Sequence, residues 1–133
     1  MTMNNSTTTQ RGATRLLNFI KSHDPVARLV GDGSIIQIVR PELDLGGDFI
    51  KLAVERHKTK LLVHDGTYTL GFMNSLDDDN LREINEVLAE YGADPLSDRC
   101  RQIQIRSSRA DYPESRDKVC QAIVAVERLI EGA

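Results

Sequence analysis

The stretch Lys60–Leu70 (KLLVHDGTYTL) constrains the fold most, because an apolar strand there runs directly into a tight polar turn. Asp65 and Gly66 suit such a turn, since Asp bonds to its own backbone and Gly tolerates a positive φ. The chain before this stretch has the pattern of short strands, and most of the chain after it has helical periodicity. The sequence therefore predicts an α+β domain, in which an antiparallel sheet of four or five strands is packed by two or three helices.

The predicted strands are short and are separated by turn residues. Asp48–Glu55 alternates most regularly, with Ile50, Leu52 and Val54 on one face, so the opposite face of the sheet should meet water. The strand segments are Val26–Val30, Ser34–Arg40, Asp48–Glu55, the start of Lys60–Leu70, and Arg101–Arg106. Their connections are the Gly31-Asp32-Gly33 turn, the Pro41–Gly47 loop and the Arg56–Thr59 turn. Pairing in sequence order gives a meander with one face free for helices and the last strand at its edge.

Three segments have the periodicity of amphipathic helices. The first spans Ala13–Lys21 and ends before Pro25, because a residue that precedes proline disfavours the helical region. Asn80 should cap the second helix, with Glu83 as its capping-box partner and Gly92 as its left-handed C-terminal residue. The final helix should begin around Pro113, and both later helices should bury one stripe. These stripes comprise Leu81, Ile84, Val87, Leu88 and Tyr91, and then Val119, Ala122, Ile123, Val126, Leu129 and Ile130.

The remaining segments and the composition indicate one domain. Residues 1–12 are rich in Ser, Thr and Asn, so we predict a disordered tail followed by a single α+β domain over residues 13–133. Gly71–Leu76 should form one helical turn with Phe72 and Met73 directed inward. No apolar run approaches the roughly 20 residues that a membrane span needs, and the N-terminus lacks a secretory pattern. We therefore expect a cytoplasmic protein that does not engage membranes.

The Cys and His residues do not have the spacing of a metal site. Cys100 and Cys120 lie far apart without a CxxC neighbour, and a cytosolic protein favours free thiols. Cys120 falls among the apolar positions of the final helix, which indicates packing. A site built from His57, His64 and Asp65 would match no established signature, so we predict neither a metal nor a cofactor.

Two Asp-Gly turns carry residue types that acid-base chemistry uses. His64 and Asp65 could orient an imidazole, and Asp32 could join them if both turns lay at the same end of the sheet. The alternative, which we favour, is that Asp and Gly occur there because tight turns prefer them. No phosphate loop supports an enzyme, so we predict a non-catalytic protein.

Charge is distributed unevenly around a net charge of -3. Carboxylates gather at the start and along the second helix: Asp77, Asp78, Asp79, Glu83, Glu86 and Glu90. Capping and the helix dipole ordinarily explain acidic residues at a helix start, but such a row can also imitate a phosphate backbone and occupy a basic groove. Basic residues gather later: Arg99, Arg101, Arg106, Arg109, Arg116 and Lys118. These either hold phosphates or protect an edge strand from aggregation.

Four short motifs occur in an order that resembles one family. They are Asp32-Gly33-Ser34-Ile35-Ile36, Val63-His64-Asp65-Gly66-Thr67, Val87-Leu88-Ala89-Glu90-Tyr91-Gly92-Ala93 and Val119-Cys120-Gln121-Ala122-Ile123. Over Asp24 to Ile130 the chain resembles an uncharacterised domain of unknown function carried by bacteria, prophages and other mobile elements. That family has two consecutive Asp residues before the Gly of the second turn, whereas His64 takes the first position here. The resemblance implies no established activity, but small phage-borne proteins often counter host defences or regulate neighbouring genes.

Two classes of function remain open. The first, which we favour, is a non-catalytic interaction protein that inhibits a host defence complex, in the manner of an anti-CRISPR protein, through its charged surfaces or a sheet edge. The second is a small nucleic-acid-binding or regulatory module that uses the region Arg99–Lys118. Separate acidic and basic faces on one small domain also favour a homodimer.

Overall fold

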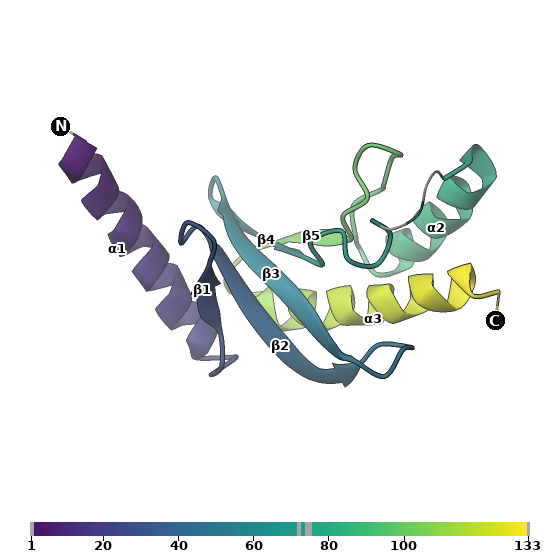
Figure 1. Ribbon diagram of the computed structural model, residues 1–133, viewed down its shortest axis with the longest axis horizontal. Helices are drawn as coiled ribbons and strands as arrows, with labels where there is room; N and C mark the ends of the chain where they lie inside the picture. The colour runs from purple at the N-terminus through teal and green to yellow at the C-terminus, as the bar shows by residue number, and fades with distance from the viewer. Residues whose placement is uncertain (1, 72, 74–75, 133) are drawn as a thin grey trace.

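The computed structural model of the protein describes residues 2–71, 73 and 76–132, with side chains from residue 12 onward. Its elements follow the order α1 (Thr2–Lys21), β1 (Arg28–Val30), β2 (Ile35–Leu43), β3 (Phe49–His57), β4 (Lys60–His64), α2 (Asp78–Glu90), β5 (Gln104–Ser107) and α3 (Tyr112–Ile130). The strands form one antiparallel sheet in the order β1-β2-β3-β4-β5 (Figure 1). Both the α+β class and the predicted meander are therefore confirmed.

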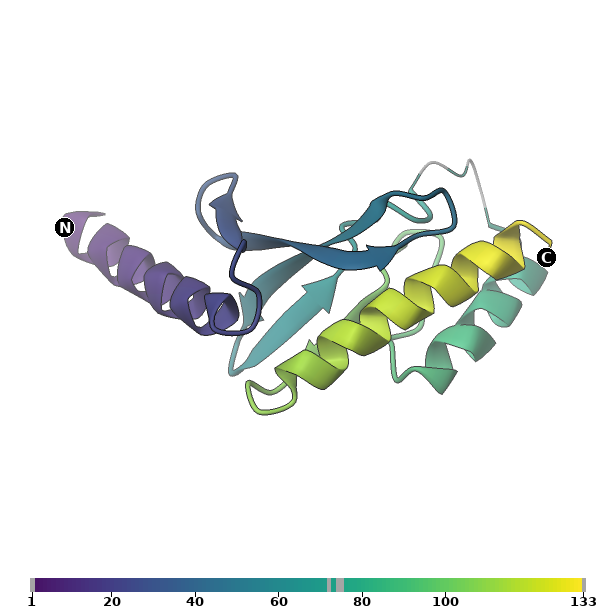
Figure 2. The same ribbon diagram turned by 90° about the horizontal axis from the view of Figure 1, so that it is seen from below.

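The sheet has one covered face and one open face. On β3, Ile50, Leu52 and Val54 are buried and the residues between them are exposed or half-buried, as the alternation predicts. Figure 2 shows α2 and α3 together on one side of the sheet. Leu16 and Ile20 bring the C-terminal part of α1 into the same core. Among the described residues, no helix combines the length and the hydropathy that crossing a membrane requires.

The start of α2 differs from its prediction, whereas its end and the start of α3 agree. Gly92 follows α2 with a φ of 73°, and Pro113 lies in the first turn of α3. The predicted cap at Asn80 is wrong, because the side chain of Asp77 accepts a hydrogen bond from the Asn80 N–H at 2.8 Å. The helix thus begins three residues earlier, and Glu83 lies too far along it to complete a capping box.

Most of the predicted core positions are buried. The predicted stripe of α2 has two buried residues, Ile84 and Leu88, and three half-buried ones, Leu81, Val87 and Tyr91. The stripe of α3 has four buried residues, Val119, Ala122, Ile123 and Val126, and two half-buried ones, Leu129 and Ile130. Both cysteines are free thiols, and Cys120 is buried, as its place among the apolar positions of α3 predicts, whereas Cys100 is exposed. Met73 packs partly buried against this core, whereas Phe72 lies outside the described residues.

α1 is longer than its pattern indicates. The helix begins at Thr2, whereas the sequence predicts a disordered tail over residues 1–12. Leu16 and Ile20 anchor the helix in the core, and adding residues to an existing helix costs much less than nucleating a new one. Ser, Thr and Asn lower helix propensity only moderately, so the helix can continue through them.

The strand boundaries also differ from their predictions, most at the end of β2 and the start of β5; β1 begins two residues later and β3 ends two residues later than predicted. β2 continues to Leu43 through the predicted loop, because its pairing with β3 shifts between Val39 and Leu43 and Pro41 interrupts no regular ladder there. β5 begins at Gln104 rather than Arg101, since the N–H of Ile103 is bound by Asp65 at 3.1 Å and not by a strand. The late strand does pair with β4 at the sheet edge, as expected.

Candidate functional site

The glutamates predicted as an interaction surface lie on the exposed side of α2. Steps of four, three and four residues connect Asp79, Glu83, Glu86 and Glu90, which places these exposed side chains on one face of the helix. At about 1.5 Å per residue, this acidic stripe is ~16 Å long. Arg82 Nη2 lies 3.3 Å from Asp79 Oδ1. Among the residues that the structure describes, no cation forms an ion pair with Glu83, Glu86 or Glu90.

The aspartates at the start of α2 have a role in the helix itself. Asp77 is the N-cap, and Asp78 and Asp79 occupy the first turn, where the positive end of the helix dipole stabilises carboxylates. The three glutamates lie further along and contribute nothing comparable to the helix end. The structure thus separates the predicted acidic group into a structural part and an unassigned part.

Arg101 of the predicted basic group is held inside the fold. Its side chain donates to the carbonyl oxygens of Leu70 and Met73 and pairs with the carboxylate of Asp98. Only 13% of the side chain is exposed, so its charge is directed at the protein's own backbone. Arg101 therefore fixes the segment after β4 rather than presenting a phosphate-binding group.

The other basic residues also make internal contacts, with one exception. Arg106 Nε lies 3.2 Å from Asp94 Oδ2, and Lys118 Nζ lies 3.1 Å from Glu114 Oε1. The guanidinium of Arg109 stands 5.2 Å from the ring centroid of Phe19, and Arg116 belongs to a buried network. Arg99 is exposed, and of the six it is the one for which the described residues provide no partner. Four of the six basic residues, namely Arg101, Arg106, Arg116 and Lys118, are thus paired with carboxylates of the protein itself.

Asp65 holds the turn after β4 in shape. Its Oδ1 accepts hydrogen bonds from the N–H groups of Thr67 at 2.9 Å and Ile103 at 3.1 Å, and its Oδ2 accepts one from Thr69 at 3.2 Å. The carboxylate is buried, and backbone donors occupy both of its oxygens. The geometry agrees with the structural interpretation of this Asp-Gly turn.

His64 faces Glu55 rather than Asp65. Its Nε2 lies 2.5 Å from Glu55 Oε2, and its Nδ1 accepts a hydrogen bond from the N–H of Gly66 at 2.9 Å. Because Nδ1 accepts, Nε2 carries the proton and donates it to the carboxylate. The imidazole is buried, so both ring nitrogens are occupied within the fold.

The two Asp-Gly turns lie at opposite ends of the sheet. β2 and β4 run in the same direction, since each is antiparallel to β3. Asp32 precedes β2 and Asp65 follows β4, so the structure does not bring them together. Asp32 accepts hydrogen bonds from the N–H and hydroxyl of Ser34, which lower the pKa of its exposed carboxyl. His57 lies exposed at the β3–β4 turn, and the described residues contain no group of three metal-ligand side chains suited to an ion.

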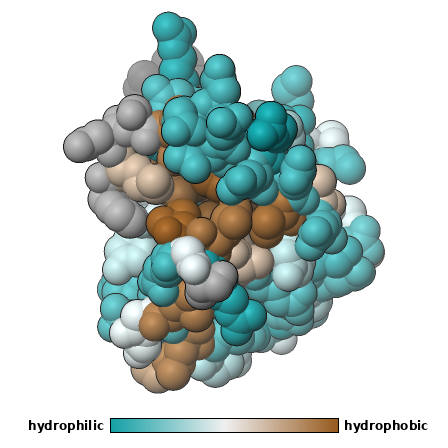
Figure 3. Space-filling model, turned by 90° about the vertical axis from the view of Figure 1, so that its right-hand side faces the viewer, coloured by the Kyte–Doolittle hydropathy of each residue, from teal (hydrophilic) through white to brown (hydrophobic). Residues whose placement is uncertain are grey.

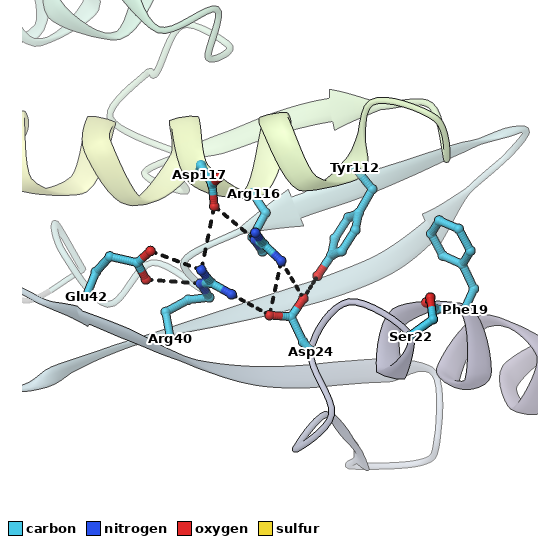
Figure 4. A network of polar contacts seen from close by, with 8 residues as sticks. All are labelled: Phe19, Ser22, Asp24, Arg40, Glu42, Tyr112, Arg116 and Asp117. Atoms are coloured by element: carbon cyan, nitrogen blue, oxygen red, sulfur yellow. Dashed lines mark hydrogen bonds and ion pairs between the residues drawn. The ribbon is translucent and has the colours of Figure 1, made fainter.

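A buried ionic network, which the sequence analysis does not single out, joins the end of α1 to β2 and α3 (Figure 4). At its centre, Asp24 is 4% exposed and accepts hydrogen bonds from Arg40 at 2.6 Å, Arg116 at 3.1 Å and the Tyr112 hydroxyl at 2.8 Å. Burial raises the pKa of Tyr112, and its bond to Asp24 raises it further. The Tyr112 hydroxyl therefore stays protonated as a donor.

Two outer carboxylates complete this network. Glu42 binds Arg40 through two hydrogen bonds of 3.0 Å, and Asp117 accepts one of 3.0 Å from Arg116. Burial alone lowers the pKa of Arg40, but its bonds to Glu42 and Asp24 outweigh burial and raise it. One signal in the sequence could have revealed the pair: Arg40 and Glu42 continue the inward-facing positions of β2 at intervals of two.

Comparison of the chain with protein-family models, with curated proteins and with solved structures found no significant match. The candidate site therefore depends on the geometry alone. Within that geometry, the acidic stripe of α2 combines exposure and regular spacing, and its three glutamates have no ion-pair partner among the described residues.

Proposed function

We propose that this protein is a non-catalytic interaction protein, and that the acidic stripe of α2 docks against a basic surface of a partner protein. The observation that carries the proposal is the difference between the two charged groups. Glu83, Glu86 and Glu90 are exposed and unpaired among the described residues, whereas most of the basic group is held in internal contacts. The protein therefore presents negative charge outward over one helix face.

A row of carboxylates on a rigid helix suits a partner that normally holds nucleic acid. A basic groove that binds phosphates attracts such a row through the same long-range field, which speeds association and weakens as salt increases. The resemblance to a domain of mobile elements adds a host defence complex as the partner class within this proposal. A cytoplasmic location is part of the same proposal.

The decisive experiment compares two sets of neutralising substitutions. Glu83→Gln, Glu86→Gln and Glu90→Gln together neutralise the three glutamates of the acidic stripe and leave Asp79 and the Asp77 cap intact. Arg99→Gln, Arg106→Gln and Lys118→Gln form the matched control. Each protein is used for affinity capture from the organism that carries the gene, and the captured partner is then titrated at two salt concentrations. The stripe variant should bind about tenfold more weakly, because three exposed charge contacts of about 0.5 kcal/mol each are lost.

The control variant should bind within about twofold of the unmodified protein, since none of its three residues belongs to α2 and Arg106 and Lys118 are paired with carboxylates of the protein itself. A reversed pattern, in which the control set abolishes binding and the stripe set does not, would contradict the proposal. Titration with duplex DNA and with single-stranded RNA at low salt completes the experiment. Tight binding of either that depends on Arg99 would favour the nucleic-acid-binding module instead.

A further inference from the structure

A groove of about 650 Å³ opens beside the first half of β3. β4 pairs with β3 only from Ala53 to His57, so Phe49–Leu52 has no strand neighbour on that side among the described residues. The segment 65–69 passes this edge instead, and Ile123 and Glu127 of α3 line the groove from below. In Figure 1 the lower half of β3 lies apart from β4, with α3 passing behind. In the part of the chain that the structure describes, the sheet therefore leaves Phe49–Leu52 without a strand partner on the side that lines the groove.

Three exposed apolar or aromatic side chains stand in the walls of the groove. Phe49 is 59% exposed and Tyr68 is 74% exposed, and both line the groove together with Val39. Figure 3 faces the right-hand end of Figure 1, where the β2–β3 turn, α2 and the C-terminal end of α3 lie, and shows apolar surface exposed at this end between hydrophilic regions. Contiguous exposed apolar surface indicates a contact site, and the volume falls within the range of about 300–1,000 Å³ that is typical of ligand sites.

The loop that carries Tyr68 is held rigidly. Thr67 has a φ of 67°, a left-handed conformation that is rare for a β-branched residue. Asp65 stabilises it by accepting the N–H groups of Thr67 and Thr69. The aromatic ring is thus presented by a fixed and strained backbone, a combination that is concentrated at binding sites.

The charge along the groove is predominantly negative. Asp44, Asp48 and Glu127 line it against the single cation Lys51, and none of the three carboxylates has an ion-pair partner among the described residues. Burial raises the pKa of Glu127, and the negative charge of Asp44 raises it further. A hydrogen bond from the N–H of Leu45 lowers this pKa but does not cancel the rise. A cation bound here would offset this repulsion.

We propose that the groove binds an extended peptide segment of a partner protein, which adds to the free edge of β3 at Phe49–Leu52. Apolar side chains of the segment pack on Phe49 and Tyr68, and a Lys or Arg side chain reaches Glu127. A peptide fits better than a small molecule, because an unpaired strand edge needs a row of backbone donors and acceptors. The groove uses none of the residues of the acidic stripe, and neither proposal depends on the other.

The experiment selects linear twelve-residue peptides from a random display library on the full-length protein. Selected sequences should alternate β-branched or aromatic residues with Lys or Arg. Binding of the synthesised peptides should fall about tenfold or more for Phe49→Ser with Tyr68→Ser, which remove two exposed anchors, and about three- to tenfold for Glu127→Gln. The matched controls are Val26→Ser with Leu29→Ser, just before and within the edge strand β1, and Glu114→Gln on the same helix as Glu127; none of the three residues lines the groove, so these variants should bind within about twofold.

Alternate N-methylation of the selected peptides tests strand addition directly. Methyl groups on the amides that face β3 should abolish binding, whereas methyl groups on the other amides should be tolerated, because only one edge of the peptide pairs. The proposal is overturned if no peptide is enriched, if the enriched sequences are acidic, or if the control substitutions reduce binding as much as the groove substitutions. Equal tolerance of both methylation patterns would also overturn it, in favour of side-chain or small-molecule recognition.

Discussion

Asp24 shows how a single residue can hold distant parts of this chain together. Its carboxylate follows α1 and binds Arg40 of β2 and both Tyr112 and Arg116 of α3. Each of these groups is nearly inaccessible to water, so each would be costly to leave without its partner. The network therefore fixes how α1 meets the sheet and α3.

Substituting Asp24 tests this role. Asp24→Ala should lower the free energy of unfolding by about 3–5 kcal/mol, because Arg40 and Arg116, whose side chains are only 13% and 11% exposed, each lose one of their carboxylate partners. Tyr112→Phe removes one hydroxyl donor and should cost about 1–1.5 kcal/mol. Asp32→Ala, at an exposed turn, is the control and should cost less than about 1 kcal/mol. Urea unfolding monitored by circular dichroism measures all three, and equal losses for Asp24→Ala and Asp32→Ala would contradict the network's importance.

At the scale of elements, α2 shows what periodicity predicts and what it leaves open. The apolar spacing identifies the helix and its buried side, but Asp77, Asp78, Asp79 and Asn80 are all good caps, so composition alone does not fix the start. The structure selects Asp77. This choice places Leu76, which is buried, immediately before the cap, in the position of a hydrophobic staple. The spacing of Leu76 and Leu81 on either side of this cap is the signal in the sequence that would have located the start.

The candidate site, like the start of α2, was predictable from the sequence only in part. The acidic stripe follows from helical spacing alone, so Glu83, Glu86 and Glu90 could be identified before the structure was known. The ionic network and the groove could not, because they depend on contacts between segments far apart in the chain, such as Asp24 with Arg116. Local pattern predicts faces of elements, but it does not predict which faces meet.

The cap at Asp77 can be tested against the predicted cap at Asn80. Asp77→Ala removes the acceptor for the Asn80 N–H and should destabilise the protein by about 1 kcal/mol. Asn80→Ala keeps that backbone donor and replaces Asn by a better helix former, so its effect should be neutral or slightly stabilising. Thermal unfolding of both variants measures the difference. A larger loss for Asn80→Ala would show that the helix begins at the later position.

At the scale of the whole molecule, one hydrophobic core connects all three helices and the sheet. The core extends from Leu16 and Ile20 of α1 across the sheet to Leu88 of α2 and Val126 of α3. A chain of 133 residues with a single core should unfold in one cooperative step. The acidic stripe and the groove are then two surfaces of one rigid unit, and a substitution in one leaves the other in place.

Truncating Leu88 tests whether α2 belongs to this unit. Leu88 is fully buried, so Leu88→Ala should cost about 2–5 kcal/mol through lost contacts and a cavity. The transitions followed by far-UV and near-UV circular dichroism should shift together to lower urea concentration and remain superimposable, because α2 and the sheet share the core. Val87→Ala, at a half-buried neighbour, is the control and should shift the midpoint less. If α2 folded as a separate unit, Leu88→Ala would instead remove part of the helical signal early and leave the near-UV transition, which reports on Tyr112 inside the main core, at its original midpoint.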